Sequence, residues 1–449
     1  MNQITLNNAI GTFKEKFKKS GELCEHANQF IPGGYSRNSL TFGPHAIYVE
    51  RGDGQFIDTI DGERLLDFHN NFSANVVGHN HPKVREAIEE ILAKGFSFGN
   101  PVPHEHELAR LLCERIDAVE KVIFSCSATE SCLSAIRIAR ANTGKNKIAK
   151  FEGGYHGMGD EFMMSLHPLT ELFPGPSNHP IPVPNTAGLP ERVRQEVVAL
   201  PQNDLASCER ILRAHANDTA GLIMELQTGA GGVIVLDKEF AQGIRALTQE
   251  LGILMIIDET ITLRASYHGM QSLYDVKPDL VVMGKAIGGG LPIGALGGRA
   301  EYFEMGLQGL VYHSGTHHGH PLATAAGLAC MEVMDEQAHS RLNAYAERIK
   351  TELTRWVNEN DYPFIIYGIG SHLGYEFTDE PGRQYKSCRD ILQFSNEEHM
   401  QTFAFEMANR GIFPMFRGQM ALSEPMREAD IDQFVNTAQE IISGMLVDG

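Results

Sequence analysis

Short apolar runs alternate with amphipathic helical segments along most of this 449-residue chain. A helix is predicted between Pro82 and Gly95, where apolar residues recur at helical spacing and the glycine provides a stop. Four apolar runs are too short for helices and are partly β-branched, as is typical of buried strands: 122–124, 222–224, 253–257 and 280–283. This alternation predicts an α/β fold with a mainly parallel sheet.

Both ends of the chain carry further patterns. Helices are expected within 108–116, 130–144, 323–334 and 342–359, and strands at 46–49 and 56–60. A weak boundary near 300–325 precedes a smaller α+β segment. We therefore expect an N-terminal segment of a small domain, a large central domain and a C-terminal small domain, over 1–64, 65–321 and 322–449.

The composition excludes several kinds of partner. The chain has 38 basic and 57 acidic residues and a formal charge of −19, so nucleic acid and anionic membranes would be repelled. No apolar stretch approaches the length of a membrane span, and the N-terminus lacks a signal-peptide core. Seven scattered cysteines without a CxxC pair favour a reducing compartment. These features predict a cytoplasmic protein.

Two reactive residues directly follow predicted strands, where open α/β sheets bind ligands. Asp258 ends GILMIIDE and suits a protonated ring nitrogen of a cofactor, although a helix cap or a surface acid would also fit. Lys285 follows DLVVMG, where partial desolvation lowers the pKa of an amine and suits a Schiff-base nucleophile. The glycines at 288–290 allow close approach to a ligand. A surface lysine beside a flexible loop is the alternative.

Two other segments offer an anion site and a stacking ring. Ser127, Ala128 and Thr129 lie where a strand leads into a helix, so free N–H groups and two hydroxyls could hold a phosphate. Ordinary N-capping would use the same residues. Tyr155 follows paired glycines and could lie flat on a ligand ring, or belong to the core. Together the four segments favour pyridoxal 5'-phosphate (PLP) and amino-group transfer.

Seven stretches resemble the class III aminotransferases of PLP fold type I. The similarity runs from about Pro32 to the C-terminus and is strongest to the branch with glutamate-1-semialdehyde aminomutases and β-amino-acid (β-phenylalanine-type) aminotransferases. The stretches are IPGG, LLDFHNNFSANVVGHNHP, SATESCLSAIRIAR, KFEGGYHGMGD, IIDE, PDLVVMGKAIGGGLPIGALGGR and HSGTHHGHPLATAAGLA. The resemblance implies a large PLP-binding domain and a smaller α+β domain formed by the N- and C-terminal segments.

The resemblance also implies a role for each matching residue. Lys285 would hold the cofactor as a Schiff base and then act as general base, and Asp258 would pair with the pyridine nitrogen. Tyr155 would stack on the ring, and Glu225 matches a glutamate beside it. The phosphate would be bound by Ser127, Ala128 and Thr129. Thr316 matches a threonine that reaches the phosphate of the partner subunit, which implies a homodimer.

Several positions depart from the family pattern. Ala128 replaces a usual glycine, Thr260 a valine, Leu226 a proline and His320 an asparagine. These changes leave Lys285 and Asp258 in place and bear on substrate identity. The segment HSGTHHGH also suggests a metal, but no cysteine or acid stands within it at ligand spacing, so we expect none. His156 is interpreted as structural for the same reason.

Two arginines point to the substrate. Arg37, in PGGYSRN, and Arg417, in FRGQM, match arginines that handle substrate carboxylates in β-amino-acid aminotransferases, although each could be a surface arginine. The prediction is a transaminase acting on a carboxylate-bearing amine and a 2-oxo acid. A glutamate-1-semialdehyde-type aminomutase, a PLP-dependent racemase and a catalytically silent binding protein are the alternatives.

Overall fold

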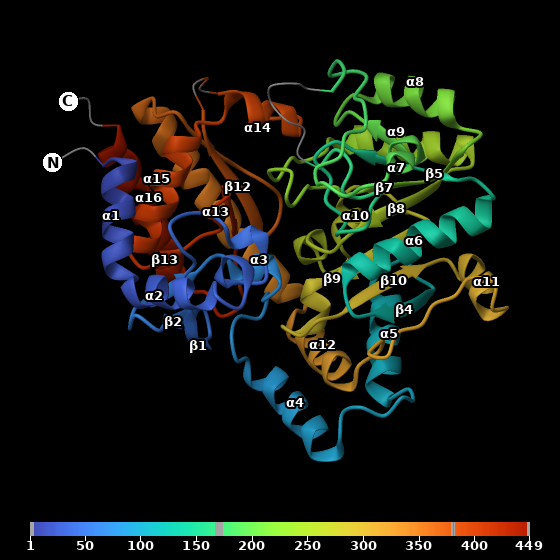
Figure 1. Ribbon diagram of the computed structural model, residues 1–449, viewed down its shortest axis with the longest axis horizontal. Coiled ribbons are helices and arrows are strands. Elements are labelled where there is room, and N and C mark those ends of the chain that lie inside the picture. Colours follow the sequence, from blue (N-terminus) through green and yellow to red (C-terminus); the bar gives the residue numbers. More distant parts are fainter. Residues whose placement is uncertain (1–3, 167–173, 379, 381, 447–449) are drawn as a thin grey trace.

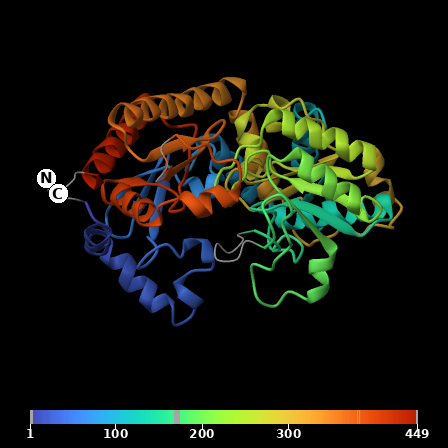
Figure 2. The ribbon, with the colours of Figure 1, turned by 90° about the horizontal axis from the view of Figure 1, so that it is seen from above.

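The computed structural model describes residues 4–166, 174–378, 380 and 382–446, drawn as coloured ribbon in Figure 1. The outer ends of the two predicted terminal segments, 1–3 and 447–449, lie outside the described residues. The chain forms two lobes (Figures 1 and 2). One lobe contains the central part of the sequence, and the other brings both ends of the chain together.

A seven-stranded sheet forms the centre of the larger lobe, in the order β4-β10-β9-β8-β7-β5-β6. β10 runs antiparallel to both neighbours, and the remaining pairs are parallel, so the other strands share one direction. The four strands predicted in this lobe are present, which confirms the α/β fold. The strand bounds are β4 Lys121–Ser125, β5 Lys147–Phe151, β6 Val197–Leu200, β7 Thr219–Met224, β8 Leu254–Asp258, β9 Leu280–Gly284 and β10 Gly294–Gly298.

Helices cover both faces of this sheet because successive strand residues point to opposite sides. On β8, Ile256 packs with the apolar face of α6, whereas Met255 and Ile257 pack with α8 and α9. α5 and α12 cover the β9–β10–β4 end on the same side as α8 and α9. The helices of this lobe are α4 Pro82–Lys94, α5 Pro103–Arg115, α6 Ala128–Thr143, α7 Glu191–Glu196, α8 Leu205–His215, α9 Lys238–Leu251, α10 Met270–Leu273, α11 Glu304–Leu307 and α12 Pro321–Val333.

The smaller lobe is assembled from the two ends of the chain. β13, from the C-terminal part, pairs in parallel with β3, from the N-terminal part, through Ile412 and Leu66. The Ile4 N–H also donates to the Gly444 carbonyl over 3.0 Å. Its two sheets have the orders β1-β2-β3-β13 and β11-β12-β14. The bounds are β1 Val49–Asp53, β2 Phe56–Thr59, β3 Arg64–Asp67, β11 Phe364–Tyr367, β12 His372–Phe377, β13 Ile412–Phe413, β14 Gln419–Ala421, α1 Leu6–Lys16, α2 Lys18–Ala27, α3 Asn70–Ser73, α13 Glu336–Asn360, α14 Cys388–Phe394, α15 Glu397–Asn409 and α16 Glu428–Met445.

Two predicted boundaries differ from the structure. The strand expected at 46–49 was wrong, since β1 begins only at Val49. The helix expected over 342–359 begins earlier, at Glu336, because the Asp335 side chain accepts a hydrogen bond from the Ala338 N–H over 2.8 Å and caps the first turn. Within the described part of the chain, none of the helices is both long and apolar enough to cross a membrane.

Candidate active site

A cavity of about 410 Å³ opens where the parallel strands end. Its wall is formed by residues at or shortly beyond the ends of β4, β5, β7, β8 and β9, together with the segment that leads into β10. Asn71, His156 and Thr260 line it. Seven of the eight predicted cofactor residues line it as well: Ser127, Ala128, Thr129, Tyr155, Glu225, Asp258 and Lys285. The sheet therefore gathers side chains that are far apart in the sequence.

Lys285 stands at the end of β9, directly beyond Gly284. Its backbone has φ 48°, a left-handed conformation that a lysine rarely adopts and that is often found at functional sites. Burial lowers the pKa of its amine to about 8, against the attraction of the nearby Glu225 and Asp258 carboxylates. Burial therefore increases the neutral fraction of this amine near neutral pH, and the neutral form is the one that acts as a nucleophile or base.

Asp258 ends β8 and is 3% exposed. Burial on its own would raise the pKa of this carboxyl, but hydrogen bonds from His156 and from the Thr260 N–H lower it below its usual value. The His156 Nδ1 lies 2.9 Å from Asp258 Oδ2, and burial lowers the pKa of this histidine. A neutral His156 that donates Nδ1–H to an ionised Asp258 is consistent with the lowered pKa of both residues. The site thus keeps a negative charge at the base of the cavity.

The helix α6 begins at the edge of the cavity. The Ser127 side chain caps it by accepting a hydrogen bond from the Glu130 N–H, while the first N–H groups of the helix have no acceptor within the helix. The methyl group of Ala128 faces Gly284, where a built Cβ would lie 3.1 Å from it. The methyl thus packs on the backbone before Lys285.

Tyr155 and Glu225 are linked across the cavity wall. The Tyr155 N–H donates to Glu225 Oε2 over 3.0 Å, and the Gly229 N–H donates to the other oxygen over 2.9 Å. The Tyr155 side chain is 39% exposed, so it is not a core tyrosine. Burial, followed by the charge of Asp258, raises the pKa of Glu225 to about 8. Burial therefore favours the protonated form of Glu225 when the cavity holds only protein groups.

The remaining predicted residues lie outside the cavity wall. Arg37 and Arg417 stand over the same ring, with their guanidinium carbons 5.4 and 5.0 Å from the Phe72 centroid. Arg37 Nη1 also donates to Asn71 Oδ1 over 2.8 Å, and Asn71 lines the cavity. Thr316 is exposed and does not line the cavity of its own chain.

The chain belongs to the class-III aminotransferases, whose family model matches residues 39–434. It is 35% identical to glutamate-1-semialdehyde 2,1-aminomutase 2 from Geobacillus kaustophilus, over 95% of this chain and 98% of that protein. It is also similar to the crystal structure of an omega-transaminase from Sphaerobacter thermophilus, with a TM-score of 0.90, 34% identity and coverage of 95% and 97%. A β-phenylalanine aminotransferase from Variovorax paradoxus gives a TM-score of 0.89 at 29% identity, with coverage of 98% and 97%.

This protein is thus a PLP-dependent aminotransferase of fold type I, and its cavity fits that cofactor. A helix N-terminus suits a phosphate, the ionised Asp258 suits a pyridinium nitrogen, and a half-exposed tyrosine offers a ring face. The amine of Lys285 completes the set.

The interpretation of His156 as a structural residue missed its contact with Asp258. The sequence order Tyr155–His156 gives no sign of that contact, because β5 and β8 are separated by β7 in the sheet. Asn71 was also missed, since it comes from a short left-handed turn in α3 that no hydrophobic period marks. Both residues act on groups that were predicted: His156 on Asp258 and Asn71 on Arg37.

Proposed function

We propose that this enzyme moves an amino group between a carboxylate-bearing amine, such as a β-amino acid, and a 2-oxo acid. In this proposal Lys285 is the catalytic residue and the cofactor contacts are those predicted: Ser127, Ala128, Thr129, Tyr155, Glu225 and Asp258. Their common position around one cavity at the strand ends supports these roles. PLP, when bound, supplies an aldehyde for the substrate amine and a ring that withdraws electrons from the carbon that bears this amine.

Each protein group has a separate role in the proposed reaction. Lys285, whose amine has a lowered pKa, would take and return the proton of the substrate carbon that bears the amine, which is Cβ in a β-amino acid. Asp258 would hold a proton on the ring nitrogen, and His156 orients Asp258 through the 2.9 Å hydrogen bond. The N–H groups at the start of α6 would bind the phosphate. Tyr155 would offer a ring face to the cofactor.

The proposed substrate class rests on one observation, the two guanidinium groups of Arg37 and Arg417 over the Phe72 ring. Arg37 is tied to the cavity through Asn71, and the charge of Arg417 acts on both Tyr155 and Lys285. Two cations beside one cavity favour a substrate that carries carboxylates, because guanidinium binds carboxylate through two hydrogen bonds. A β-amino acid as amino donor and a 2-oxo acid as acceptor both meet this requirement.

We also propose that the enzyme works as a homodimer. The exposed position of Thr316, away from the cavity of its own chain, supports a role in the site of a partner. The test mixes Lys285→Ala and Thr316→Ala chains. Hybrid dimers should contain one site with both residues intact, and the mixture should exceed the average activity of the separate variants. Activity equal to that average would refute the shared site.

The similarity to glutamate-1-semialdehyde aminomutases supports a second candidate, an enzyme that moves the amino group within one molecule. A half-reaction screen separates the two. PLP-loaded enzyme is mixed with single amines while the absorbance of the cofactor is followed. Conversion by β-amino acids, with return on addition of a 2-oxo acid, supports the proposal. Conversion of a diamino or amino-oxo acid by the pyridoxamine form with no acceptor would favour the mutase, and deuterium uptake at Cα without cofactor conversion would favour a racemase.

A further inference from the structure

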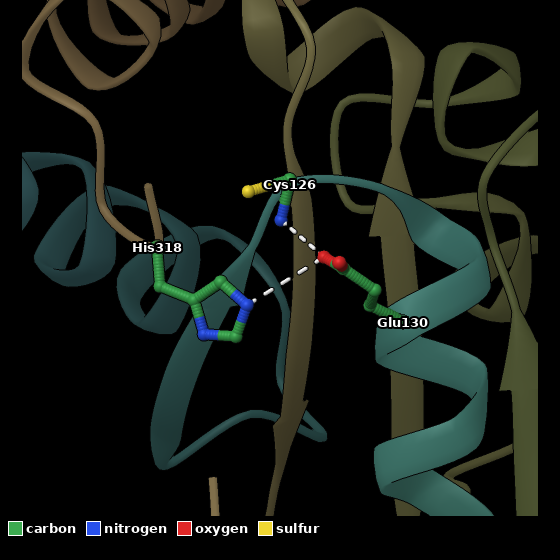
Figure 3. Close-up of side chains that lie close together, drawn as sticks. All are labelled: Cys126, Glu130 and His318. Atoms are coloured by element: carbon green, nitrogen blue, oxygen red, sulfur yellow. Dashed lines mark hydrogen bonds and ion pairs between the residues drawn. The ribbon is translucent and has the colours of Figure 1, made fainter. Parts of the chain in front are cut away.

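Cys126, Glu130 and His318 form a cluster beside the start of α6 (Figure 3). Cys126 follows β4, Glu130 lies in the first turn of α6, and His318 comes from the segment before α12. The thiol sulfur, a carboxylate oxygen and an imidazole nitrogen all lie within 4.8 Å of one another. The sequence could not indicate this cluster, because almost the whole of the large lobe separates His318 from the other two residues.

The three donor types are those that zinc and similar ions select. Zinc binds thiolate, imidazole and carboxylate with tetrahedral geometry, and sites with three protein ligands leave the fourth position to water. With zinc bonds of about 2.0–2.2 Å to nitrogen and oxygen, those two ligand atoms stand roughly 3.4 Å apart. His318 Nε2 already lies 3.5 Å from Glu130 Oε2. The Cys126 sulfur lies within 4.8 Å of both atoms.

Helix capping explains part of this cluster but not all of it. Glu130 Oε2 accepts a hydrogen bond over 2.7 Å from the N–H of Cys126, the residue before the N-cap Ser127. The same oxygen lies 3.5 Å from His318 Nε2 and keeps a second lone pair for an ion, and the cap needs neither the Cys126 thiol nor the His318 ring. The Glu130 side chain is 46% exposed, so an ion can reach the cluster from solvent.

We propose that Cys126, Glu130 and His318 form a binding site for one divalent transition-metal ion of the zinc class. The thiolate, a carboxylate oxygen and imidazole Nε2 are the protein ligands, and water takes the fourth position. Metal binding takes the proton from the thiol and releases it to solvent. Cys126 also lines the cofactor cavity, but none of the three ligands has a role in the proposed recognition of the substrate, so the proposal does not depend on the substrate.

Cobalt(II) tests the proposal, because thiolate ligation gives a charge-transfer band and tetrahedral geometry gives intense visible bands. The PLP-loaded protein is titrated with Co²⁺, and the cofactor spectrum is subtracted. We expect one equivalent per chain to produce both features and Zn²⁺ to displace it. Cys126→Ser should abolish the thiolate band, and His318→Gln should weaken binding at least tenfold while keeping all cysteines.

Two matched variants control for adventitious binding. Cys113→Ser removes another half-buried thiol, and His317→Gln removes the adjacent histidine, which lies outside the cluster. Both should bind Co²⁺ like the parent protein. A parent protein without a thiolate band overturns the proposal. A band that persists in Cys126→Ser, or an equal loss in His317→Gln and His318→Gln, overturns it as well.

Discussion

Replacing Arg37 by alanine tests the proposed recognition of the substrate carboxylate. A charge-assisted hydrogen bond contributes about 1.5–3 kcal/mol. If the guanidinium binds the carboxylate in the transition state, its loss lowers kcat/KM for carboxylated amines by about tenfold to a hundredfold. Because Arg37 is exposed and water competes for the guanidinium, we expect the effect in the lower part of this range.

The contacts of Arg37 also limit how far Arg37→Ala can lower the free energy of unfolding. Arg37→Ala deletes the 2.8 Å hydrogen bond to Asn71 and the contact with the Phe72 ring. At an exposed position these contribute roughly 0.5–1.5 and 0.5–1 kcal/mol to the free energy of unfolding. The variant should therefore remain folded and keep its cofactor. Any loss of activity then reports on binding.

The assay compares kcat/KM for a β-amino acid and for a matched amine without the carboxylate. The fall in kcat/KM should be far larger for the β-amino acid, because the plain amine has no carboxylate that could pair with Arg37. Arg213→Ala on α8, where the arginine pairs only with surface glutamates, is a control and should change neither value. If both substrates fall equally with Arg37→Ala, the arginine has a structural role and the aminomutase alternative gains support.

Three further predictions follow from the contacts of buried carboxylates. Asp258→Asn should lower kcat by orders of magnitude, since an amide cannot hold the ring proton; a loss under about tenfold, or 1.4 kcal/mol, in steady-state assays would contradict the role. In cofactor-free protein, the pKa of Glu225 is raised to about 8, so the unfolded chain binds fewer protons from about pH 4.5 to 8 and stability falls as pH rises through this window. Glu225→Gln should flatten that fall in urea unfolding, and an unchanged slope would count against a buried neutral Glu225. Arg389→Leu should lower the free energy of unfolding by about 3–5 kcal/mol, because it strands Glu152, which receives hydrogen bonds of 2.8 and 2.9 Å from Arg389; a change below about 1 kcal/mol in denaturant titrations would refute this.

Much of the cofactor cavity was predictable from strand ends. Asp258 and Lys285 follow apolar runs, and neighbouring parallel strands deliver such residues to one edge of the sheet. The helix at Ser127 was marked by capping residues and by the stop at Gly144, which has φ 69°. These signals are local, so a single sequence carries them.

Contacts between distant segments were not predictable in the same way. The bond between His156 and Asp258 depends on the order of strands in the sheet, and the meeting of Cys126 with His318 depends on the path of the chain before α12. The strand predicted at 46–49 was wrong for a related reason, since apolar residues mark burial but not ladder pairing. The sharing of Phe72 by Arg37 and Arg417 likewise requires the N- and C-terminal segments to meet.

The identity of the lysine that carries the cofactor is the most direct test of this account. Lys150 is a competitor, because it is fully buried and burial lowers the pKa of its amine to about 8 as well. Its amine, however, donates to the Met164 carbonyl over 2.6 Å and does not line the cavity. Borohydride reduction of the PLP-loaded enzyme, followed by peptide mass spectrometry, should find the pyridoxyl group on Lys285. A pyridoxyl group on Lys150 or any other lysine would contradict the account.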